Sequence, residues 1–195
     1  MKQSELFGET SALPPGFCYR AELIAPAEEA ALVDYIGTLP LEEAKYKQYT
    51  ARRRTVSYGS QYDFDANQML PAPAIPAFLD PLRSAVGRWL ELPPERFVHA
   101  LVSEYRPGAP LGWHRDVPQF EVIVGVSLGG ECVMRLRPYR PRGPNRRQDV
   151  IALTLEPRSA YVIRDEARWA WQHSIAATRA LRYSITLRTA RGSHA

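Results

Sequence analysis

The sequence predicts a mainly β protein with flanking helices, built as a double-stranded β-helix (jelly roll) that N-terminal helices buttress. Residues 97–188 contain many short apolar or alternating segments separated by turn signals, a pattern typical of a sandwich or barrel. The part before them carries two segments with helical features. The 195 residues, 45% hydrophobic and 24% charged, suffice for a single domain with a sizeable core. We therefore expect one domain over 1–195 with its jelly-roll core at 97–189.

The first predicted helix spans residues 26–37, after a loose lead-in over residues 1–15. Pro26 and the two glutamates that follow it are typical of the first turn of a helix, because proline lacks an N–H and carboxylates favour the N-terminal dipole. Pro40 ends this helix.

Residues 52–62 suggest a strand and a turn at Gly59, and the proline-containing stretch 61–76 has the composition of a loop. The next segment, residues 77–90, is a second helix. Its apolar side chains recur every three or four residues and form one face, which we expect to support a sheet: Phe78, Leu82, Val86 and Trp89.

Eight strands are predicted in the remaining chain, and tight turns at Gly129-Gly130 and at residues 156–159 separate some of them. The predicted strands are residues 97–105, 112–117, 120–128, 131–137, 149–155, 160–164, 169–175 and 181–188.

The most informative pattern is His114-x-Asp116 followed by a distant His173. Alternate residues of a strand point to the same face, so His114 and Asp116 can both reach an inward metal while Arg115 points away. Two imidazoles and one carboxylate leave one face of an octahedral ion open, as in non-haem Fe(II) oxygenases. His99, which lacks a matching partner, is expected to be structural.

The last predicted strand alternates polar and apolar side chains, with Arg182, Ser184, Thr186 and Arg188 on one face. This face could lie in water. Alternatively, Arg182 and Arg188 could point into the barrel, where their planar guanidinium groups would bind a small dicarboxylate.

Together these residues resemble the AlkB family of Fe(II)- and 2-oxoglutarate-dependent dioxygenases, which shows HxD, a distal His and RxNxTxR. The likeness runs from about Arg52 to Thr189 with order and spacing kept. Tyr105, nine residues before His114, matches a family tyrosine that bonds 2-oxoglutarate. The resemblance implies an enzyme that uses Fe(II), 2-oxoglutarate and O₂, with His114, Asp116 and His173 as the iron ligands.

The resemblance also assigns the cosubstrate site. Arg182 would pair with the distal carboxylate of 2-oxoglutarate, and Arg188 would lie near the carboxylate that chelates iron. The whole predicted set is Tyr105, Ser103, Arg182, Ser184 and Arg188. Family members hold the target nucleotide with a segment before the barrel, here residues 45–62. The candidate substrate residues are Arg52, Arg53, Arg54, Tyr58, Tyr62 and Trp113, although core packing is the alternative for each aromatic residue. Trp169 and Trp171 share the predicted strand face of His173.

The resemblance implies oxidative demethylation of N-alkylated bases in DNA or RNA, with release of succinate, CO₂ and formaldehyde. Three departures matter: Ser184 and Ser103 replace asparagines, and Pro118 replaces an acidic residue that reads an exocyclic amine. Two alternatives are therefore kept. The same iron chemistry could hydroxylate a modified tRNA base or a protein side chain, or a catalytically silent barrel could bind nucleic acid.

Charge and cysteine content suggest the setting. The formal net charge is +4, and arginines cluster at residues 52–54 and 135–147, as expected for a polyanionic partner. The alternative is a solvated loop. The two cysteines lack metal-type spacing, which favours a cytoplasmic protein. The chain contains no 18-residue apolar run and no signal-peptide pattern, so we expect no membrane association, and no obligate protein partner is evident.

Overall fold

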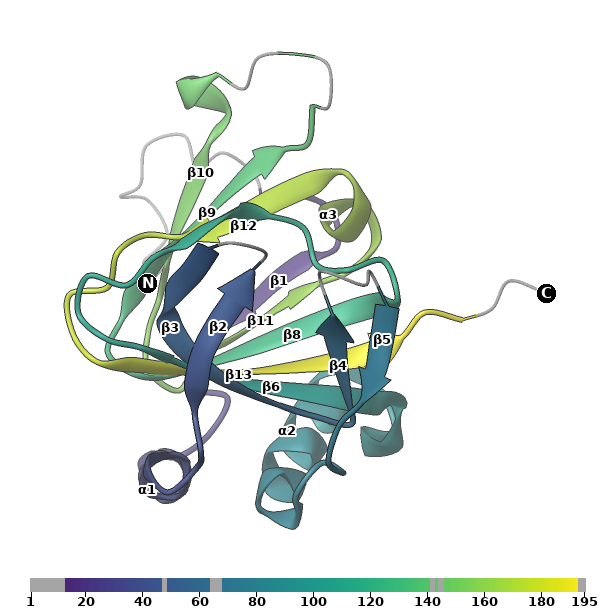
Figure 1. The fold of residues 1–195 in the computed structure, drawn as a ribbon. Coiled ribbons are helices and arrows are strands. Elements are labelled where there is room, and N and C mark those ends of the chain that lie inside the picture. Colours follow the sequence, from purple (N-terminus) through teal and green to yellow (C-terminus); the bar gives the residue numbers. More distant parts are fainter. Residues whose placement is uncertain (1–12, 47–48, 64–67, 141–142, 144–145, 193–195) are drawn as a thin grey trace, which may run out of the picture.

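Two antiparallel sheets face each other in the computed structural model, which describes residues 13–46, 49–63, 68–140, 143 and 146–192 (Figure 1). The large sheet contains, in spatial order, β1 (Phe17–Arg20), β11 (Ala160–Ile163), β8 (Phe120–Gly129), β13 (Arg182–Ala190), β6 (Phe97–Tyr105), β3 (Tyr49–Tyr58) and β2 (Glu42–Tyr46). The small sheet contains β10 (Ile151–Leu155), β9 (Cys132–Pro138), β12 (Trp171–Ile175) and β7 (Leu111–His114). The predicted mainly β jelly roll is confirmed.

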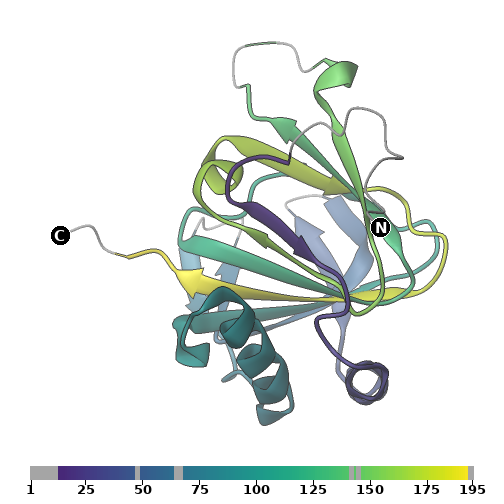
Figure 2. The ribbon, with the colours of Figure 1, turned by 180° about the vertical axis from the view of Figure 1, so that it is seen from behind.

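The two predicted helices, α1 (Pro26–Gly37) and α2 (Asp80–Leu90), lie against the outer face of the large sheet (Figure 2). Their apolar side chains share a buried cluster with outward residues of the central strands. This cluster includes Ile36, Leu82, Val86, Val102, Val126, Ile185 and Leu187. The helices thus hold the large sheet from behind and leave its other face to the space between the sheets.

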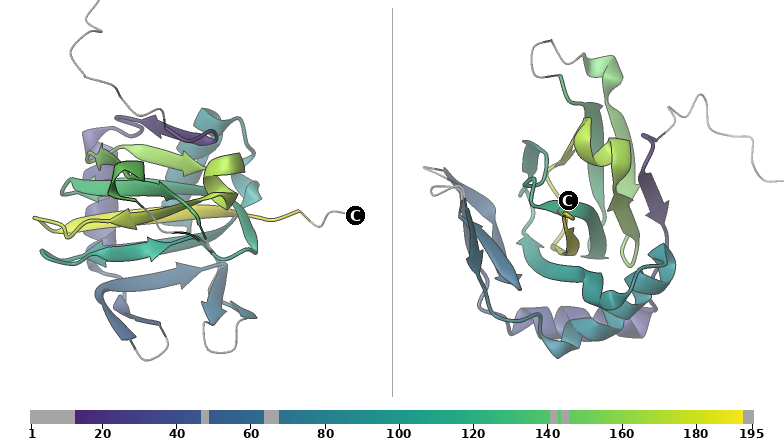
Figure 3. Two further views of the ribbon diagram at one scale, coloured as in Figure 1. Left: turned by 90° about the horizontal axis from the view of Figure 1, so that it is seen from above. Right: turned by 90° about the vertical axis from the view of Figure 1, so that its right-hand side faces the viewer.

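The two sheets face each other (Figure 3), and a second buried cluster fills part of the space between them. It includes Ile123, Met134, Leu136, Ile163 and Ile175. The rest of that space is lined by polar side chains of the large sheet and by the ends of β7 and β12, where the candidate site lies. Short elements complete the fold: β4 (Ser60–Asp63), β5 (Gln68–Pro71), α3 (Asp165–Trp169), and the 3₁₀ turns Ala77–Leu79, Pro94–Arg96 and Arg147–Asp149.

Several predicted boundaries were wrong. The stretch 61–76, read as a loop, contains the β4–β5 hairpin, and the edge strands β1 and β2 were not predicted. Residues 169–175 are not one strand, because Trp169 ends helix α3. The strand predicted to reach residue 117 ends at His114.

The segment after His114 follows an irregular path because a buried arginine holds it. The Arg168 guanidinium, 3% exposed, donates to the carbonyl oxygens of Asp116, Val117 and Phe120 at 2.7–3.2 Å. Arg168 lies about fifty residues away from these carbonyl groups in sequence, so local patterns could not show the contact. Among the described helices, none is long and apolar enough to cross a membrane. The structure does not describe residues 1–12 of the predicted lead-in or residues 47–48 of the segment 45–62.

Candidate metal centre

The inner face of the large sheet carries polar rows that run across its strands. Residues directly opposite each other on neighbouring strands point to the same face. The register aligns Arg53, Tyr105 and Arg182 in one row. It aligns a second row of small hydroxyl side chains, Thr55, Ser103, Ser184 and Ser127. The row of Arg53, Tyr105 and Arg182 therefore lies beside a row of hydroxyl groups inside the fold.

Three potential metal ligands converge above this face. His114 at the end of β7 and His173 on β12 are register partners, and their ring centroids lie 4.2 Å apart. Ligand atoms of His114, Asp116 and His173 all lie within 4.8 Å of one another, with 3.6 Å between His173 Nε2 and Asp116 Oδ2. His114 Nδ1 lies 2.9 Å from the Gly112 carbonyl oxygen, which can only accept, so Nδ1 carries the proton and Nε2 keeps its lone pair for a metal.

Asp116 is oriented by an arginine rather than by strand alternation. The strand ends at His114, so the prediction that strand alternation turns Asp116 toward the metal was wrong. Arg188 Nε and Nη2 both donate to Asp116 Oδ1, at 2.9 and 2.6 Å, so Oδ2 is the oxygen turned toward His173. Arg188 Nη1 lies 3.1 Å from His99 Nδ1. A guanidinium can only donate, so the His99 nitrogen accepts and His99 supports Arg188.

The protonation states suit a divalent metal. Burial, followed by the proximity of His114, lowers the pKa of His173 to about 3, and burial lowers the pKa of His114 as well. Burial alone would raise the pKa of Asp116, but the Arg188 guanidinium and the neighbouring imidazoles outweigh it, so the pKa of Asp116 lies below its usual range. At neutral pH the three groups are two neutral imidazoles and one carboxylate, the forms that bind metals.

Arg182 is a buried cation with unused donor capacity. The residue is 1% exposed, and Nε donates to Ser127 Oγ at 3.0 Å. Within the described part of the chain, Arg182 Nη1 and the nearby Ser103 Oγ are buried without a hydrogen-bond partner. The guanidinium lies 5.0 Å from the ring centroid of Tyr105, itself 3% exposed. Because unsatisfied buried charge is costly, this pocket fits an anionic ligand.

Tyr161 on β11 completes this pocket and was missed by the sequence reading. Its ring lies over Gly125 so closely that an added Cβ there would come within 2.3 Å of Tyr161 Cζ. Burial raises the pKa of Tyr161, while the charge of Arg182 lowers it and that of Asp116 raises it, so the phenol is protonated at neutral pH. Gly125 in a strand interior was the one sequence signal of a close approach there.

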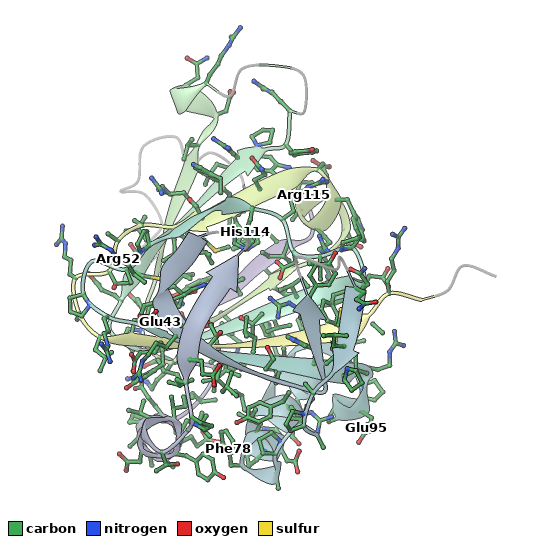
Figure 4. All side chains as sticks on the ribbon, in the orientation of Figure 1. Glu43, Arg52, Phe78, Glu95, His114 and Arg115 are labelled. Carbon is green, nitrogen blue, oxygen red and sulfur yellow. The ribbon has the colours of Figure 1, made fainter. Side chains whose placement is uncertain are left out.

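The predicted substrate residues do not form one group. Arg52 is exposed on β3 (Figure 4). Arg53 lies in the inner row with its Nε buried and, among the described atoms, unpartnered. Arg54 instead forms a two-point ion pair with Glu104, at 2.8 and 2.7 Å. Tyr58 belongs to the core behind the large sheet, so we do not retain it as a substrate residue.

The other aromatic candidates lie in different places. Tyr62 is half-buried on β4, opposite Met69 of β5. Trp113 precedes His114 on β7 and lies under the guanidinium groups of Arg135 and Arg137 on the outer side of the small sheet. It therefore does not wall the metal pocket. Trp169 is in a helix and does not share a strand face with His173, although Trp171 does.

Comparison with known families agrees with this arrangement. A family model described as the 2OG-Fe(II) oxygenase superfamily matches residues 34–189, which include all three candidate ligands and both arginines of the last strand. The chain belongs to the 2OG-Fe(II) oxygenase superfamily. It is thus a 2-oxoglutarate-dependent dioxygenase, and the cofactors of this family are Fe(II), 2-oxoglutarate and O₂.

Two relatives and one solved structure place this oxygenase more closely. The protein L905 of Acanthamoeba polyphaga mimivirus is 28% identical over 165 residues, 82% of this chain and 72% of the relative. The tRNA (carboxymethyluridine(34)-5-O)-methyltransferase ALKBH8 of Macaca fascicularis is 28% identical over 173 residues, 84% of this chain. This chain spans only about a quarter of that relative (24%). The structure of OsALKBH1 superposes with a TM-score of 0.71 and 16% identity, covering 91% of this chain and 98% of that chain. The AlkB resemblance is confirmed.

The residues of this oxygenase fit the family's cofactors. The donor set is two imidazole nitrogens and one carboxylate oxygen, which suits Fe(II) and leaves coordination positions for a chelating keto acid and O₂. The buried Arg182 Nη1 and Ser103 Oγ are the orphaned donors that a dicarboxylate would satisfy.

Proposed function

We propose that this 2OG-Fe(II) oxygenase oxidises alkylated bases in DNA or RNA. The observation that carries this proposal is the convergence of His114, Asp116 and His173 opposite the buried, underused cation Arg182. This combination offers an iron site and a carboxylate site in one polar chamber.

We assign His114, Asp116 and His173 as the iron ligands, with Arg188 holding Asp116 Oδ1 so that Oδ2 can face the metal. Arg182 binds the distal carboxylate of 2-oxoglutarate through the nitrogen that otherwise lacks a partner. The bound iron supplies the O₂-dependent oxidation of a C–H bond, coupled to conversion of 2-oxoglutarate to succinate and CO₂.

Hydroxyl groups and tyrosines complete the cosubstrate site. Ser103 and Ser184 are register partners on β6 and β13, 1% and 4% exposed, and they offer hydroxyl donors next to Arg182. Tyr105 packs under the Arg182 guanidinium, and its predicted hydrogen bond to 2-oxoglutarate is part of this proposal. Tyr161 adds a protonated phenol near Arg182 and Asp116.

For an N-methyl substrate the product chemistry is simple. One oxygen atom is inserted into the methyl C–H bond, and the resulting N–CH₂OH group loses its C–N bond to give formaldehyde and the free amine. Arg53, whose charge acts on His114 and whose Nε lacks a described partner, is our candidate for contacting the anionic backbone of the substrate at the site. The free cysteines Cys18 and Cys132 fit a cytoplasmic setting, which we also propose.

A second candidate is hydroxylation of a modified tRNA base without loss of a carbon atom. Two observations favour it: the similarity to ALKBH8, whose name describes a tRNA-modifying enzyme, and Pro118, which offers no side-chain acceptor for the exocyclic amine of a methylated base. Here the product retains the new hydroxyl group and no formaldehyde is released.

Both candidates can be tested with one panel of N-methylated DNA, N-methylated RNA and total tRNA. The wild-type protein, loaded anaerobically with Fe(II) and started with O₂, should release succinate and formaldehyde in equal amounts with the methylated oligonucleotides. Succinate with a hydroxylated tRNA nucleoside and no formaldehyde would establish the second candidate. If none of the panel stimulates succinate release above that of a His114→Ala control, the proposal is wrong.

A further inference from the structure

The outer face of the small sheet carries an ordered cluster of arginines around one tryptophan. We name it the arginine–tryptophan face, defined by Trp113 on β7 and Arg135 and Arg137 on β9. The Arg135 and Arg137 guanidinium carbons lie 5.3 and 4.2 Å from the Trp113 ring centroid. The flanking residues Met134 and Leu136 are buried between the sheets, so both arginines point outward.

Neighbouring strands fix both guanidinium groups by one hydrogen bond each. Arg135 Nε donates to Ser174 Oγ at 3.1 Å, and Arg137 Nε donates to Gln172 Oε1 at 3.0 Å. Each bond uses the Nε nitrogen, so the terminal nitrogens of both guanidinium groups keep donor capacity. In the described part of the structure these terminal nitrogens have no carboxylate partner.

Acidic side chains are absent from the strands that form this face. The four strands of the small sheet, β7, β9, β10 and β12, contain no Asp or Glu. The adjacent Asp149 is paired with Arg140 at 2.7 Å. Helices α1 and α2 lie behind the large sheet (Figure 3), so neither covers this face. Ordered, outward guanidinium groups without carboxylates are complementary to a chain of phosphates.

The cluster continues along the rim toward the metal centre. Arg115 lies 3.7 Å from the ring centroid of Tyr139, and its Nη1 donates to the carbonyl oxygen of Trp169 at 3.0 Å, so it projects toward α3 (Figure 4). Arg191 lies 4.7 Å from the Trp169 ring centroid. Trp113 and Arg115 flank His114 in sequence. A nucleic-acid strand held on the outer face therefore reaches the metal centre by passing the β7 edge of the small sheet.

We propose that the arginine–tryptophan face binds the phosphate backbone of a single-stranded RNA segment that flanks the oxidised base. This inference rests on the proposed action on nucleic acid. The Gln172 amide favours RNA over DNA: its oxygen accepts from Arg137, which leaves the amide N–H₂ to donate to a ribose 2′-hydroxyl. Trp113 lies beneath both guanidinium groups, and these cation–π contacts help to hold them in place.

The test compares two double variants that lower the net charge equally. Arg135→Gln/Arg137→Gln removes the outward charges and keeps the side-chain stems. The control, Arg20→Gln/Arg88→Gln, changes two exposed arginines on β1 and α2. Binding of the metal-loaded proteins to a fluorescent single-stranded RNA of 15 nucleotides is measured by anisotropy across a salt series, and thermal melts check folding.

Loss of two phosphate contacts should reduce the slope of log K against log salt by about 1.4, because each contact to a single strand contributes about 0.7. On the same basis, affinity at 0.1 M salt should fall about 25-fold. The control pair should change affinity by less than about threefold. Single-stranded DNA of the same sequence should bind more weakly than RNA to the wild type.

Three results would overturn the inference: an unchanged slope in the Arg135/Arg137 variant, an equal loss in the control pair, or equally tight binding of single-stranded DNA or of poly-glutamate. Failure of the proposed function is distinguishable. In that case no nucleic acid is oxidised, yet the salt slope still depends on Arg135 and Arg137. If oxidation occurs while the slope does not change, this inference alone is wrong.

Discussion

Replacing Arg182 should weaken the binding of 2-oxoglutarate with little change in the stability of the folded protein. Arg182 is 1% exposed, has one hydrogen bond to Ser127 Oγ, and keeps Nη1 without a described partner. Leaving such a donor unsatisfied costs about 1–3 kcal/mol. In Arg182→Met the apolar side chain fills much of the same volume and removes this cost. The substitution also removes the hydrogen bond to Ser127 Oγ, a loss of about 1 kcal/mol, so without 2-oxoglutarate the free energy of unfolding should change by less than about 1 kcal/mol.

The same substitution should weaken cosubstrate binding. A charge-assisted pair between guanidinium and carboxylate contributes about 1.5–3 kcal/mol. Its loss corresponds to a dissociation constant for 2-oxoglutarate that is about 10- to 150-fold higher. Arg182→Lys keeps the charge but not the planar fork, so it should fall between wild type and Met.

Thermal melts of the Mn(II)-loaded protein at increasing 2-oxoglutarate measure both effects, because ligand stabilisation follows the ratio of free ligand to the dissociation constant. This prediction is wrong if Arg182→Met is clearly destabilised without 2-oxoglutarate and keeps the wild-type dissociation constant for 2-oxoglutarate. That result would make Arg182 a structural residue.

Three further predictions follow from neighbouring contacts. Arg188→Leu removes the group that orients Asp116 and should weaken Mn(II) binding about 10- to 100-fold in a competition titration, whereas an unchanged affinity would show that Asp116 needs no such support. His99 has a pKa lowered by burial from 6.5 to about 3, so between these pH values the unfolded chain binds a proton that the folded protein does not. The metal-free protein should therefore lose stability as pH falls from 6.5 to 3. In urea titrations, His99→Gln should reduce this dependence of stability on pH by up to about 1.4 kcal/mol per pH unit, and an identical slope would contradict the assignment. Gly125→Ala places a methyl group against Tyr161 and should cost about 1–3 kcal/mol in denaturant unfolding, whereas the control Gly37→Ala, with nothing within 4 Å, should not destabilise; equal effects would count against the close contact.

Much of the fold could be predicted from local patterns, because helices and strands impose their own periods on the sequence. The helices at residues 26–37 and 77–90 and most of the central strands were recognised in this way. Edge strands such as β1 and β2 were not, since short segments at a sheet margin bury few side chains and show weak alternation. The helix Asp165–Trp169 was not predicted, and its last residue was assigned to a strand, because five residues cannot display a helical period.

The candidate site could be predicted in its residue types but not in its geometry. His114, Asp116 and His173 were found by spacing and resemblance, and the structure brings them together. Asp116 lies beyond the strand, where Arg188 holds its carboxylate and Arg168 holds its carbonyl oxygen. Both contacts join residues more than fifty positions apart in sequence. Tyr161 had no motif of its own.

The substrate residues were the least predictable part. Arg54 and Tyr58 lie in the same run as Arg53, yet one pairs with Glu104 and the other is in the core, because strand alternation and the partners across the sheet decide each direction. Trp113 was a candidate substrate residue because it adjoins the metal ligand His114 in sequence. A strand turns adjacent residues to opposite faces, so the neighbour of a metal ligand instead contributes to the outer surface.

Side chains from β7, the segment after it and β12 should bind one ion and leave room for 2-oxoglutarate. Anomalous diffraction from anaerobic crystals grown with Mn(II) and 2-oxoglutarate tests it most directly. We expect one strong peak bonded to His114 Nε2, Asp116 Oδ2 and His173 Nε2, with the distal carboxylate of 2-oxoglutarate on Arg182. A peak elsewhere, or 2-oxoglutarate bound without contact to Arg182, would contradict it.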